Sequence, residues 1–347
     1  METQLYHIDN AAESAEIIKK AGETLKHGGL VVFPTETVYG LGGNATDPEA
    51  AMAIYAAKGR PSDNPLIIHV ADPADAEPYA VTCDAYYRLA RHFMPGPLTV
   101  ILPKKDTIPL SVTGGLDSVA VRCPAHPVAR ALIAAAGVPI AAPSANRSGR
   151  PSPTCAAHAA EDLCGRVDMI LDGGDSEVGL ESTIVKLEGD RGILLRPGAI
   201  TPDDLRAVLS DLEIAPAVTA ALAAGERALS PGMKYRHYAP AAPLTLLEGS
   251  EDAVRAFLVE KAAETGVGIL CFDEEISQMP SGAILFPVGA RTDLATQAHR
   301  LFAALREADA APNVQRLYAH LPPKEGLGLA LYNRAIRAAA HTIVHID

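Results

Sequence analysis

The chain has 347 residues, of which 48% are hydrophobic and 21% are charged, and its net charge at pH 7 is −12. This length predicts two domains rather than a single core. Residues 1–240 hold 21 Lys and Arg against 29 Asp and Glu, and the rest hold 9 against 13, so the bulk charge of neither part indicates nonspecific nucleic-acid binding.

The cysteines and the N-terminal residues set expectations about the protein's surroundings. The five cysteines are odd in number and never form a Cys-x-x-Cys pair, which argues against a disulfide framework and a zinc site and favours a reducing cytoplasm. The first residues lack the basic and apolar segments of a signal peptide, and no apolar stretch approaches the roughly 18 residues that cross a bilayer. We therefore expect a cytoplasmic protein with no membrane partner and no metal held by the protein itself.

Residues 1–212 are expected to form an α/β domain with a twisted mixed sheet and flanking helices. Helices are expected at 11–27, 48–57, 84–93, 127–136 and 202–212. Strands, some with a turn attached, are expected at 30–33, 66–70, 98–102, 119–122, 169–174, 182–187 and 193–198. Because the strands outnumber the helices, the sheet should be mixed rather than purely parallel.

A linker at 213–241 and a smaller Rossmann-like βαβ domain at 242–347 are expected to follow. The segment Ser230–Pro240 is unusual for a linker, because it holds two Tyr, a His, a Lys and an Arg, whereas plain linkers are rich in Gly, Ser or Pro. The second domain is predicted from strands that alternate with helices. Its strands are expected at 244–247, 268–272, 284–288, 314–319 and 342–345, and its helices at 251–265, 292–308 and 330–340.

The segment Phe33–Ala45 follows a buried strand and combines hydroxyl groups with closely spaced glycines. Thr35, Glu36 and Thr37 come first, and glycines at 40, 42 and 43 are interpreted as a turn. Open α/β sheets place ligands at such strand ends. Alone, the segment fits an ordinary glycine-rich turn equally well, and Glu36 has no role that the sequence supports.

Cations occur at the ends of several expected elements. Lys58 and Arg60, with Asn64 close behind, suit the phosphates of a nucleotide, although they could equally be a solvated helix C-terminus. His69 lies within a strand, and a lone histidine there is more often a core or edge residue than a residue that binds a ligand. Arg122 ends an apolar strand and needs an anionic partner, which could be a protein carboxylate or the carboxylate of a ligand.

Hydroxyl and amide side chains complete the pattern. Ser144, Asn146 and Ser152 lie in a polar loop after a strand, Ser182 precedes a strand, and Arg196 ends one. Each alone is an ordinary polar turn, but together they predict a pocket for a small polyanion. The chain lacks a Walker A motif, Gly-x-Gly-x-x-Gly, His-Glu-x-x-His and Gly-x-Ser-x-Gly.

The order of these motifs resembles that of the YrdC-type threonylcarbamoyl-AMP synthases in their long form. The resemblance covers residues 5 to 345. It rests on Phe-Pro-Thr-Glu-Thr-Val-Tyr-Gly-Leu-Gly (33–42), Lys-x-Arg-Pro-x-x-Asn-Pro-Leu (58–66), Pro-Gly-Pro-Leu-Thr (95–99), Val-Ala-Val-Arg-x-Pro-x-His (119–126), Ala-Pro-Ser-Ala-Asn (142–146), Glu-Ser-Thr-Ile (181–184), Leu-Arg-Pro-Gly (195–198), Ser-Pro-Gly-Met-Lys-Tyr-x-His-Tyr-Ala-Pro (230–240) and Gly-Leu-Gly-Leu-Ala-Leu-Tyr-Asn-Arg (326–334).

The resemblance implies a nucleotidyltransferase that joins L-threonine, bicarbonate or CO2 and ATP into L-threonylcarbamoyladenylate and releases pyrophosphate. The product would pass to the machinery that forms N6-threonylcarbamoyladenosine at position 37 of tRNAs reading codons that begin with A. The residues implied for L-threonine are Thr37, His69, Arg122, Ala142 and Ser182. Those implied for ATP are Lys58, Arg60, Asn64, Ser118, Ser144, Ser152, Arg196 and, from the linker, Tyr235 or His237.

The resemblance implies two steps: the threonine amine forms a carbamate, and the carbamate attacks the α-phosphorus of ATP. Neither step needs a covalent enzyme nucleophile, so catalysis would rest on proximity and on cations. Lys58 and Arg60 are the expected catalytic residues, since they would stabilise charge that develops at phosphorus. Mg²⁺ is expected to be held mostly by ATP and water. Two other functions stay open: a double-stranded RNA-binding module, with weak RNA binding possible beside the enzyme activity, and a carbamoyl-transfer domain like those of hydrogenase maturation proteins.

Overall fold

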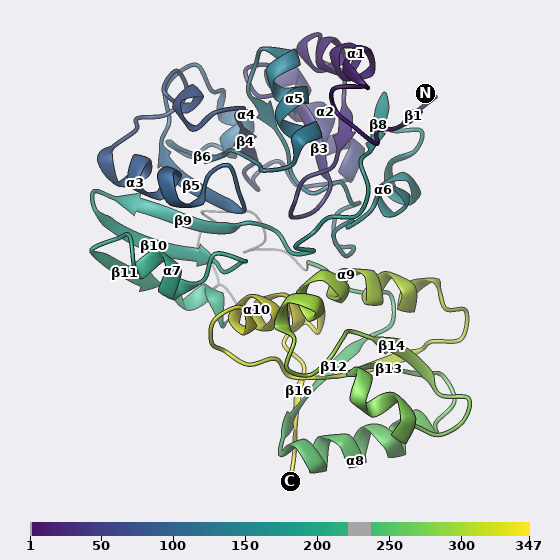
Figure 1. Ribbon diagram of the computed structural model, residues 1–347. Helices are drawn as coiled ribbons and strands as arrows, with labels where there is room; N and C mark the ends of the chain where they lie inside the picture. The colour runs from purple at the N-terminus through teal and green to yellow at the C-terminus, as the bar shows by residue number, and fades with distance from the viewer. Residues whose placement is uncertain (1, 221–236) are drawn as a thin grey trace. The chain divides into compact units, whose positions relative to one another are not determined.

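A computed structural model describes residues 2–220 and 237–347, which form two compact units (Figure 1). Among these residues, the first unit comprises 2–148 and 152–220, and the second comprises 149–151 and 237–347. No helix in the described part of the chain is long and apolar enough to span a membrane. Tyr235 and most of the predicted linker lie outside the described residues.

The first unit is built on an eleven-stranded sheet in the order β1-β8-β2-β3-β7-β4-β6-β5-β9-β10-β11. The sheet contains parallel pairs such as β4·β6 and β5·β9 together with antiparallel pairs such as β2·β3 and β5·β6. This confirms the mixed sheet. Its strands are β1 (Gln4–His7), β2 (Val31–Phe33), β3 (Gly40–Asn44), β4 (Ile67–His69), β5 (Leu98–Pro103), β6 (Ser118–Arg122), β7 (Ile140–Ala141), β8 (Met169–Asp172), β9 (Thr183–Glu188), β10 (Arg191–Arg196) and β11 (Asp211–Ile214).

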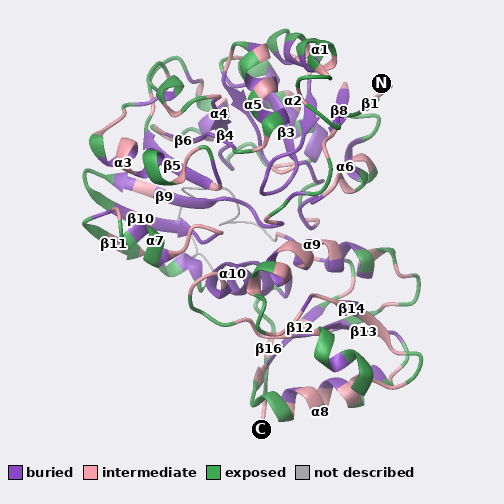
Figure 2. Ribbon diagram, in the orientation of Figure 1, coloured by how far each residue is buried: buried purple, intermediate pink, exposed green. Residues whose placement is uncertain are grey.

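Helices flank the sheet on both faces, and each face has its own apolar core. On one face, α1 and α5 pack over β2, β7 and β8. On the other, α2, α3 and α6 pack over the central strands. Figure 2 shows the strands as largely buried and the outer sides of the helices as exposed. The helices are α1 (Ala15–Lys26), α2 (Pro48–Lys58), α3 (Asp84–Phe93), α4 (Leu110–Thr113), α5 (Pro127–Ala136), α6 (Ala156–Leu163) and α7 (Pro202–Arg206).

The glycines after Phe33 form a strand, so the predicted turn at 40–43 is wrong. Gly40–Asn44 is β3, which pairs antiparallel with β2 and with β7. A Cβ on Gly42 would lie 2.8 Å from Ile140 Cγ2 and 3.0 Å from Phe33 Cε1. The glycine at this position therefore serves close packing within the sheet, and strand pairing overrides its weak strand propensity.

The end of the first unit also differs from expectation. The helix predicted at 202–212 ends at Arg206, and Asp211–Ile214 forms β11, parallel to β10. The predicted start of the linker at 213 consequently falls inside a strand. Strand β10 supplies a parallel partner for this short, half-exposed segment. No local sequence pattern could indicate that pairing. The strand β1, parallel to β8, was also not predicted.

The second unit is a parallel five-stranded sheet in the order β14-β13-β15-β12-β16. Helix α8 lies on one side of it, and α9 and α10 lie on the other (Figure 1). This confirms the Rossmann-like α/β domain. The strands are β12 (Leu244–Gly249), β13 (Val267–Cys271), β14 (Ile284–Pro287), β15 (Arg316–His320) and β16 (Ile343–Ile346), and the helices are α8 (Glu251–Ala262), α9 (Leu294–Ala310) and α10 (Gly328–Ala338).

Candidate functional site

Strand register gathers three polar side chains into one row on the first sheet. His69 on β4 is the direct partner of Arg122 on β6, and Arg122 is the direct partner of Thr99 on β5. Directly paired residues point to the same face of a sheet. Their neighbours Ile68 and Val121 point the other way, into the apolar core beneath. The row therefore lies on the face that α1 and α5 cover further along the sheet.

A β-bulge extends the row to β10. The register between β9 and β10 shifts between Leu194 and Arg196, so that Arg196 pairs with Ile184. Because side chains alternate along a strand, this shift turns Arg196 toward the face that holds Thr99. Its guanidinium donates from Nη2 to Ser182 Oγ at 3.1 Å and from Nε to Ser182 O at 3.0 Å. The Ser182 and Thr99 hydroxyls lie 2.7 Å apart.

The turn between β2 and β3 brings a carboxylate to Arg122. Glu36 Oε1 accepts from Arg122 Nη2 at 2.7 Å, and Glu36 Oε2 accepts from Ala125 N at 3.0 Å. Both charged side chains are buried. This answers the question that the sequence left open, since a protein carboxylate does pair with Arg122. The guanidinium is nevertheless not saturated, because its buried Nε has no hydrogen-bond partner among the described residues.

Thr35 and Thr37 hold the same turn in shape. Thr35 Oγ1 donates to Val38 O at 2.6 Å and lies 2.8 Å from Thr37 Oγ1. It also accepts the backbone N–H groups of Thr37 and Val38, each at 3.2 Å. Both threonines are fully buried. Thr37 therefore has a fixed position in the turn next to Glu36, with its hydroxyl beside a second hydroxyl.

His69 is a neutral imidazole in this environment. Burial, and next the charge of Arg122, lower the pKa of His69 to about 3. Its Nδ1 lies 3.2 Å from Ile67 O and 3.3 Å from Ile140 O. Carbonyl oxygens only accept, so Nδ1 carries the proton and Nε2 is left as an acceptor. The ring also packs edge-on against Phe33, with the centroids 6.1 Å apart.

Lys58 and Ser144 meet in the polar loop that follows β7. The Lys58 ammonium, at the end of α2, donates to the backbone oxygens of Ser144 and Asn146. The Ser144 hydroxyl donates to the Asn146 amide oxygen. An isolated bridge pairs Ser144 with Gly40 of β3. Lys58 thus fixes the loop that carries Ser144.

Asn64, like Arg122, has unused hydrogen-bonding capacity. Its side chain is buried, yet neither its amide nitrogen nor its amide oxygen has a partner in the part of the chain that the structure describes. A buried amide without partners costs on the order of 1–3 kcal/mol unless a ligand or water satisfies it. Arg60 lies beside it and donates from Nη2 to Pro65 O at 3.1 Å.

Two more predicted residues join these groups. The Ser152 hydroxyl donates to the buried carboxylate of Glu181, next to Ser182. Ala142 follows β7, and its N–H donates to Ile67 O at 2.9 Å, two residues before His69.

Ser118 does not lie in the row, and the structure does not test the linker residues. Ser118 begins β6, at the opposite end from Arg122, and pairs with Pro103. Four residues of strand separate the two by about 13 Å. The linker's His237 belongs to the second unit, and Tyr235 lies outside the described residues. The roles given to these residues stay predictions.

The sequence did not predict the structural roles of three residues. Thr99 was read as part of an apolar strand and of the motif at 95–99 but was given no role, although a hydroxyl among Leu98, Val100 and Ile101 was a usable signal. Glu36 was noted without a function, and Glu181 only as a neighbour of Ser182. Their partners lie 83, 86 and 29 residues away in sequence, so local patterns could not connect them.

The arrangement suits a zwitterionic amino acid beside a polyphosphate. Cationic Arg122 and Arg196, neutral His69 and several hydroxyls line one row. Buried Glu36 fixes Arg122, and buried Glu181 fixes Ser152. No serine here lies within hydrogen-bond reach of a histidine base among the contacts described, so the geometry offers no triad. Nor do three or more His, Cys, Asp or Glu residues of the described chain gather in a way that could hold a metal ion.

Comparison with known proteins finds similarity to one family over nearly the whole chain. The family model Sua5_yciO_yrdC, described as "Telomere recombination", matches residues 23–198, and the Sua5_C model, described as "Threonylcarbamoyl-AMP synthase, C-terminal domain", matches 200–340. The threonylcarbamoyl-AMP synthase of Bacillus subtilis is 44% identical over 331 residues, which is 94% of each chain. That of Pyrococcus abyssi is 43% identical over 95% of this chain and 96% of its own.

A solved structure is similar along its full length. The crystal structure of P. abyssi Sua5 complexed with L-threonine matches with a TM-score of 0.91 and 40% identity, and the match covers 100% of both chains.

Proposed function

We propose that the chain, which belongs to the Sua5/YrdC family of threonylcarbamoyl-AMP synthases, is an enzyme that makes L-threonylcarbamoyladenylate. Its substrates would be L-threonine, bicarbonate or CO2, and ATP, which makes it a nucleotidyltransferase. The product would supply the threonylcarbamoyl group of N6-threonylcarbamoyladenosine in tRNA, through the tRNA threonylcarbamoyl transferase machinery. The cytoplasmic location expected from the cysteines belongs to the same proposal.

The reaction needs two bond-forming steps and no enzyme nucleophile. The deprotonated amine of threonine attacks CO2, or bicarbonate with loss of water, and forms a carbamate. A carbamate oxygen then attacks the α-phosphorus of ATP, and pyrophosphate leaves. Charge builds up on the phosphate oxygens in the second step, so positioned cations and hydrogen-bond donors lower its barrier.

The observation that carries the threonine site is the partly used guanidinium of Arg122. Glu36 holds one side of it, and its buried Nε remains without a partner among the described residues. A carboxylate placed there would gain a charge-assisted hydrogen bond in a buried setting. Thr37, neutral His69 and Ser182 would complete this site, so the hydroxyl and amine of threonine would meet hydrogen-bonding groups of both kinds. Ala142 would border the same site.

The ATP site is proposed from Asn64 and the cations near it. The unsatisfied Asn64 amide supports an interaction with a polar ligand, because both its donor and its acceptor are available. Arg60, Ser144, Ser152 and Arg196 would contact the nucleotide, and Lys58 would act near the phosphates while it fixes the Ser144 loop. Lys58 and Arg60 would supply the catalytic positive charge. Ser118, Tyr235 and His237 stay in the proposal on the resemblance alone.

Mg²⁺ is proposed to enter with ATP. The described residues offer no cluster of three or more acidic, Cys or His ligands, and Mg²⁺ is usually held by a few protein oxygens together with phosphate oxygens and water. When bound, the ion would neutralise charge on the phosphates.

The test is an assay of purified protein with ATP, Mg²⁺, L-threonine and labelled bicarbonate. We expect pyrophosphate release that requires threonine and transfer of the label into an adenylate. Arg122→Ala should raise the KM for threonine at least tenfold, whereas Arg91→Ala, at an exposed position on α3, should leave it unchanged. Pyrophosphate release that is independent of threonine would refute the proposed reaction.

The same protein separates the two alternatives. An RNA-binding module would shift double-stranded RNA in a mobility assay at physiological salt without threonine-dependent pyrophosphate release, and a carbamoyl-transfer domain would use carbamoyl phosphate in place of bicarbonate and threonine. No contact in the described residues favours either over the synthase. Weak RNA binding beside the synthase activity would show in the mobility assay as a salt-sensitive shift.

A further inference from the structure

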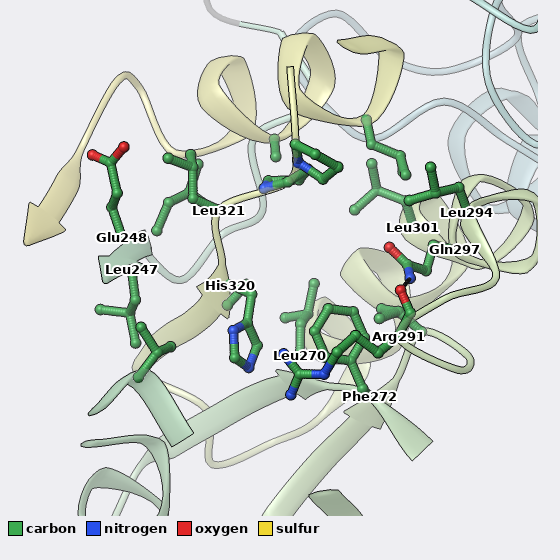
Figure 3. Close-up of a pocket in the computed structure, with 18 of the residues that line it drawn as sticks. Leu247, Glu248, Leu270, Phe272, Arg291, Leu294, Gln297, Leu301, His320 and Leu321 are labelled. Carbon is green, nitrogen blue, oxygen red and sulfur yellow. Dashed lines mark hydrogen bonds between the residues drawn. The ribbon is translucent and has the colours of Figure 1, made fainter. Parts of the chain in front are cut away.

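The second unit contains a cavity of about 550 Å³ at one edge of its sheet (Figure 3). All its strands are parallel, so their carboxyl ends lie at the same edge. The ends of β12, β13, β14 and β15 each contribute a lining residue, namely Gly249, Phe272, Val288 and His320. Open parallel sheets bind ligands outside the carboxyl ends of their strands, and the volume is in the range of small-molecule sites, about 300–1,000 Å³.

Most of the wall is apolar, and one buried amide faces inward. Gln297 on α9 is only 6% exposed. Its Nε2 donates to Ala290 O and to Arg291 O, both at 2.9 Å. Because both donor directions meet carbonyl oxygens, the amide cannot be flipped, and its Oε1 points into the cavity (Figure 3). No described residue donates a hydrogen bond to this oxygen, so a largely buried side chain presents an acceptor to the cavity.

Two cations line the cavity: Lys324, whose Nζ lies 4.9 Å from the centroid of the Tyr332 ring, and Arg291, whose charge is already neutralised. Glu275 is 1% exposed and accepts from Arg291 Nη2 at 2.9 Å and from His320 Nε2 at 2.7 Å. Arg291 Nε also lies 3.2 Å from Glu251. The guanidinium covers the ring of Phe272 at 4.6 Å, and that ring stacks on His320 with the centroids 4.8 Å apart. Arg291 is thus held flat by two carboxylates and an aromatic ring.

The turn after β12 is unsuited to phosphate. In dinucleotide-binding folds a glycine-rich first turn opens an uncapped helix toward the pyrophosphate. Here Ser250 Oγ accepts Ala253 N and caps α8. Glu248, Glu251 and Asp252 flank the turn in sequence, and Glu248 and Glu251 line the cavity, so their negative charge would disfavour a phosphate at this position.

We propose that this cavity is a second ligand site, which binds a small molecule with an apolar ring-sized body, an N–H or O–H group donated to Gln297 Oε1, and no phosphate. The apolar wall formed by Leu247, Leu270, Leu294, Leu301 and Leu321 takes the body of the ligand. The proposal is independent of the synthase reaction, because every residue in it belongs to the second unit.

Indole is the probe that tests it, because it has an apolar body and a single N–H donor. The chain contains no Trp, so indole fluorescence excited at long wavelength reports the probe alone. We expect a saturable blue shift when the full chain is added to indole. N-methylindole, which lacks the donor, should bind at least fivefold more weakly, and indoxyl phosphate should not bind. Saturating L-threonine with ATP should leave the indole Kd unchanged.

Two further measurements locate the probe. Ala319→Phe fills the cavity from β15 and should abolish the blue shift, whereas Ala310→Phe, at an exposed position on α9, should not change it. Independently of any variant, crystals of the full chain soaked in 5-bromoindole should show anomalous bromine density among Gln297, His320 and Leu321. The absence of a saturable shift, equal binding of N-methylindole, binding of indoxyl phosphate, displacement by threonine with ATP, or bromine elsewhere would each overturn the proposal.

Discussion

Glu36 and Arg122 form a buried ion pair with an Oε1–Nη2 distance of 2.7 Å, and they come from segments 86 residues apart. A buried pair is held at a desolvation cost, and removal of one partner leaves the other charge uncompensated. Glu36 also accepts Ala125 N, so it ties the β2–β3 turn to the end of β6. The pair therefore determines how Arg122 presents its remaining N–H groups, including the buried Nε–H.

Glu36→Gln tests this positioning role. We expect the Kd for threonine to rise about tenfold or more, and the free energy of unfolding to fall by about 3 kcal/mol, because a buried guanidinium loses its counter-charge. Calorimetric titration with threonine and urea unfolding measure the two effects. As a control, Glu213→Gln removes an exposed partner of Arg191 and should cost less than about 1 kcal/mol. Unchanged threonine binding in Glu36→Gln would show that Arg122 is oriented without Glu36.

His69 should make the protein sensitive to acid. Its folded-state pKa is about 3, against 6.5 for an exposed imidazole, so below pH 6.5 the unfolded chain binds a proton that the folded chain does not. The contribution of neutral His69 to the free energy of unfolding is fully present above pH 6.5. It is lost as the pH falls from 6.5 toward 3, and the loss is on the order of 2–3 kcal/mol at pH 4.5. The measurement is urea unfolding at several pH values.

The difference between two variants isolates the His69 contribution, since other groups titrate in the same range. His69→Gln should flatten the slope of unfolding free energy against pH, whereas His92→Gln, at an exposed position on α3, should keep the wild-type slope. Equal slopes in both variants would mean that His69 does not titrate as its burial indicates.

Thr99→Val removes the hydroxyl that lies 2.7 Å from Ser182 Oγ with little change in side-chain volume. One neutral hydrogen bond contributes about 0.5–1.5 kcal/mol, so we expect the KM for threonine to rise about two- to tenfold with little change in kcat. Thr113→Val, which removes another buried hydroxyl of the first unit, controls for a general loss of stability. A larger fall in kcat than in affinity would instead place Thr99 in the chemical step.

Gly198→Ala should disturb the segment that carries Ser182. A Cβ at this position would lie 2.5 Å from Thr183 N and 2.9 Å from Glu181 O, and backbone atoms cannot move aside cheaply. We expect a loss of about 1–3 kcal/mol in stability and a clear loss of threonine affinity. Gly43→Ala is the matched comparison, because its Cβ would meet the flexible ends of Ile54 at 3.1 Å and Leu30 at 3.3 Å, while the nearest backbone atom, Ala50 O, lies 3.4 Å away. If Gly43→Ala lowers affinity as much, backbone contact at Gly198 is not the cause.

Local patterns were enough to predict much of the fold. Apolar runs placed β2, β5 and β6, and the alternation of strands with helices indicated a mixed first sheet and a smaller second α/β domain. The pattern failed where pairing outweighs propensity. Gly42 of β3 is accepted in a strand because its backbone packs closely against Phe33 and Ile140, and β11 forms because β10 offers it a parallel partner.

The sequence by itself determined which side chains were candidates, because cations, hydroxyls and amides at strand ends can be read from their neighbours in the chain. Only the tertiary structure decided which of them meet. Register makes His69, Arg122 and Thr99 a row, a bulge turns Arg196 toward it, and a distant turn brings Glu36 to Arg122. These relations depend on strand pairing over long sequence separations, where a shift of one residue reverses every side chain, and no local pattern encodes that.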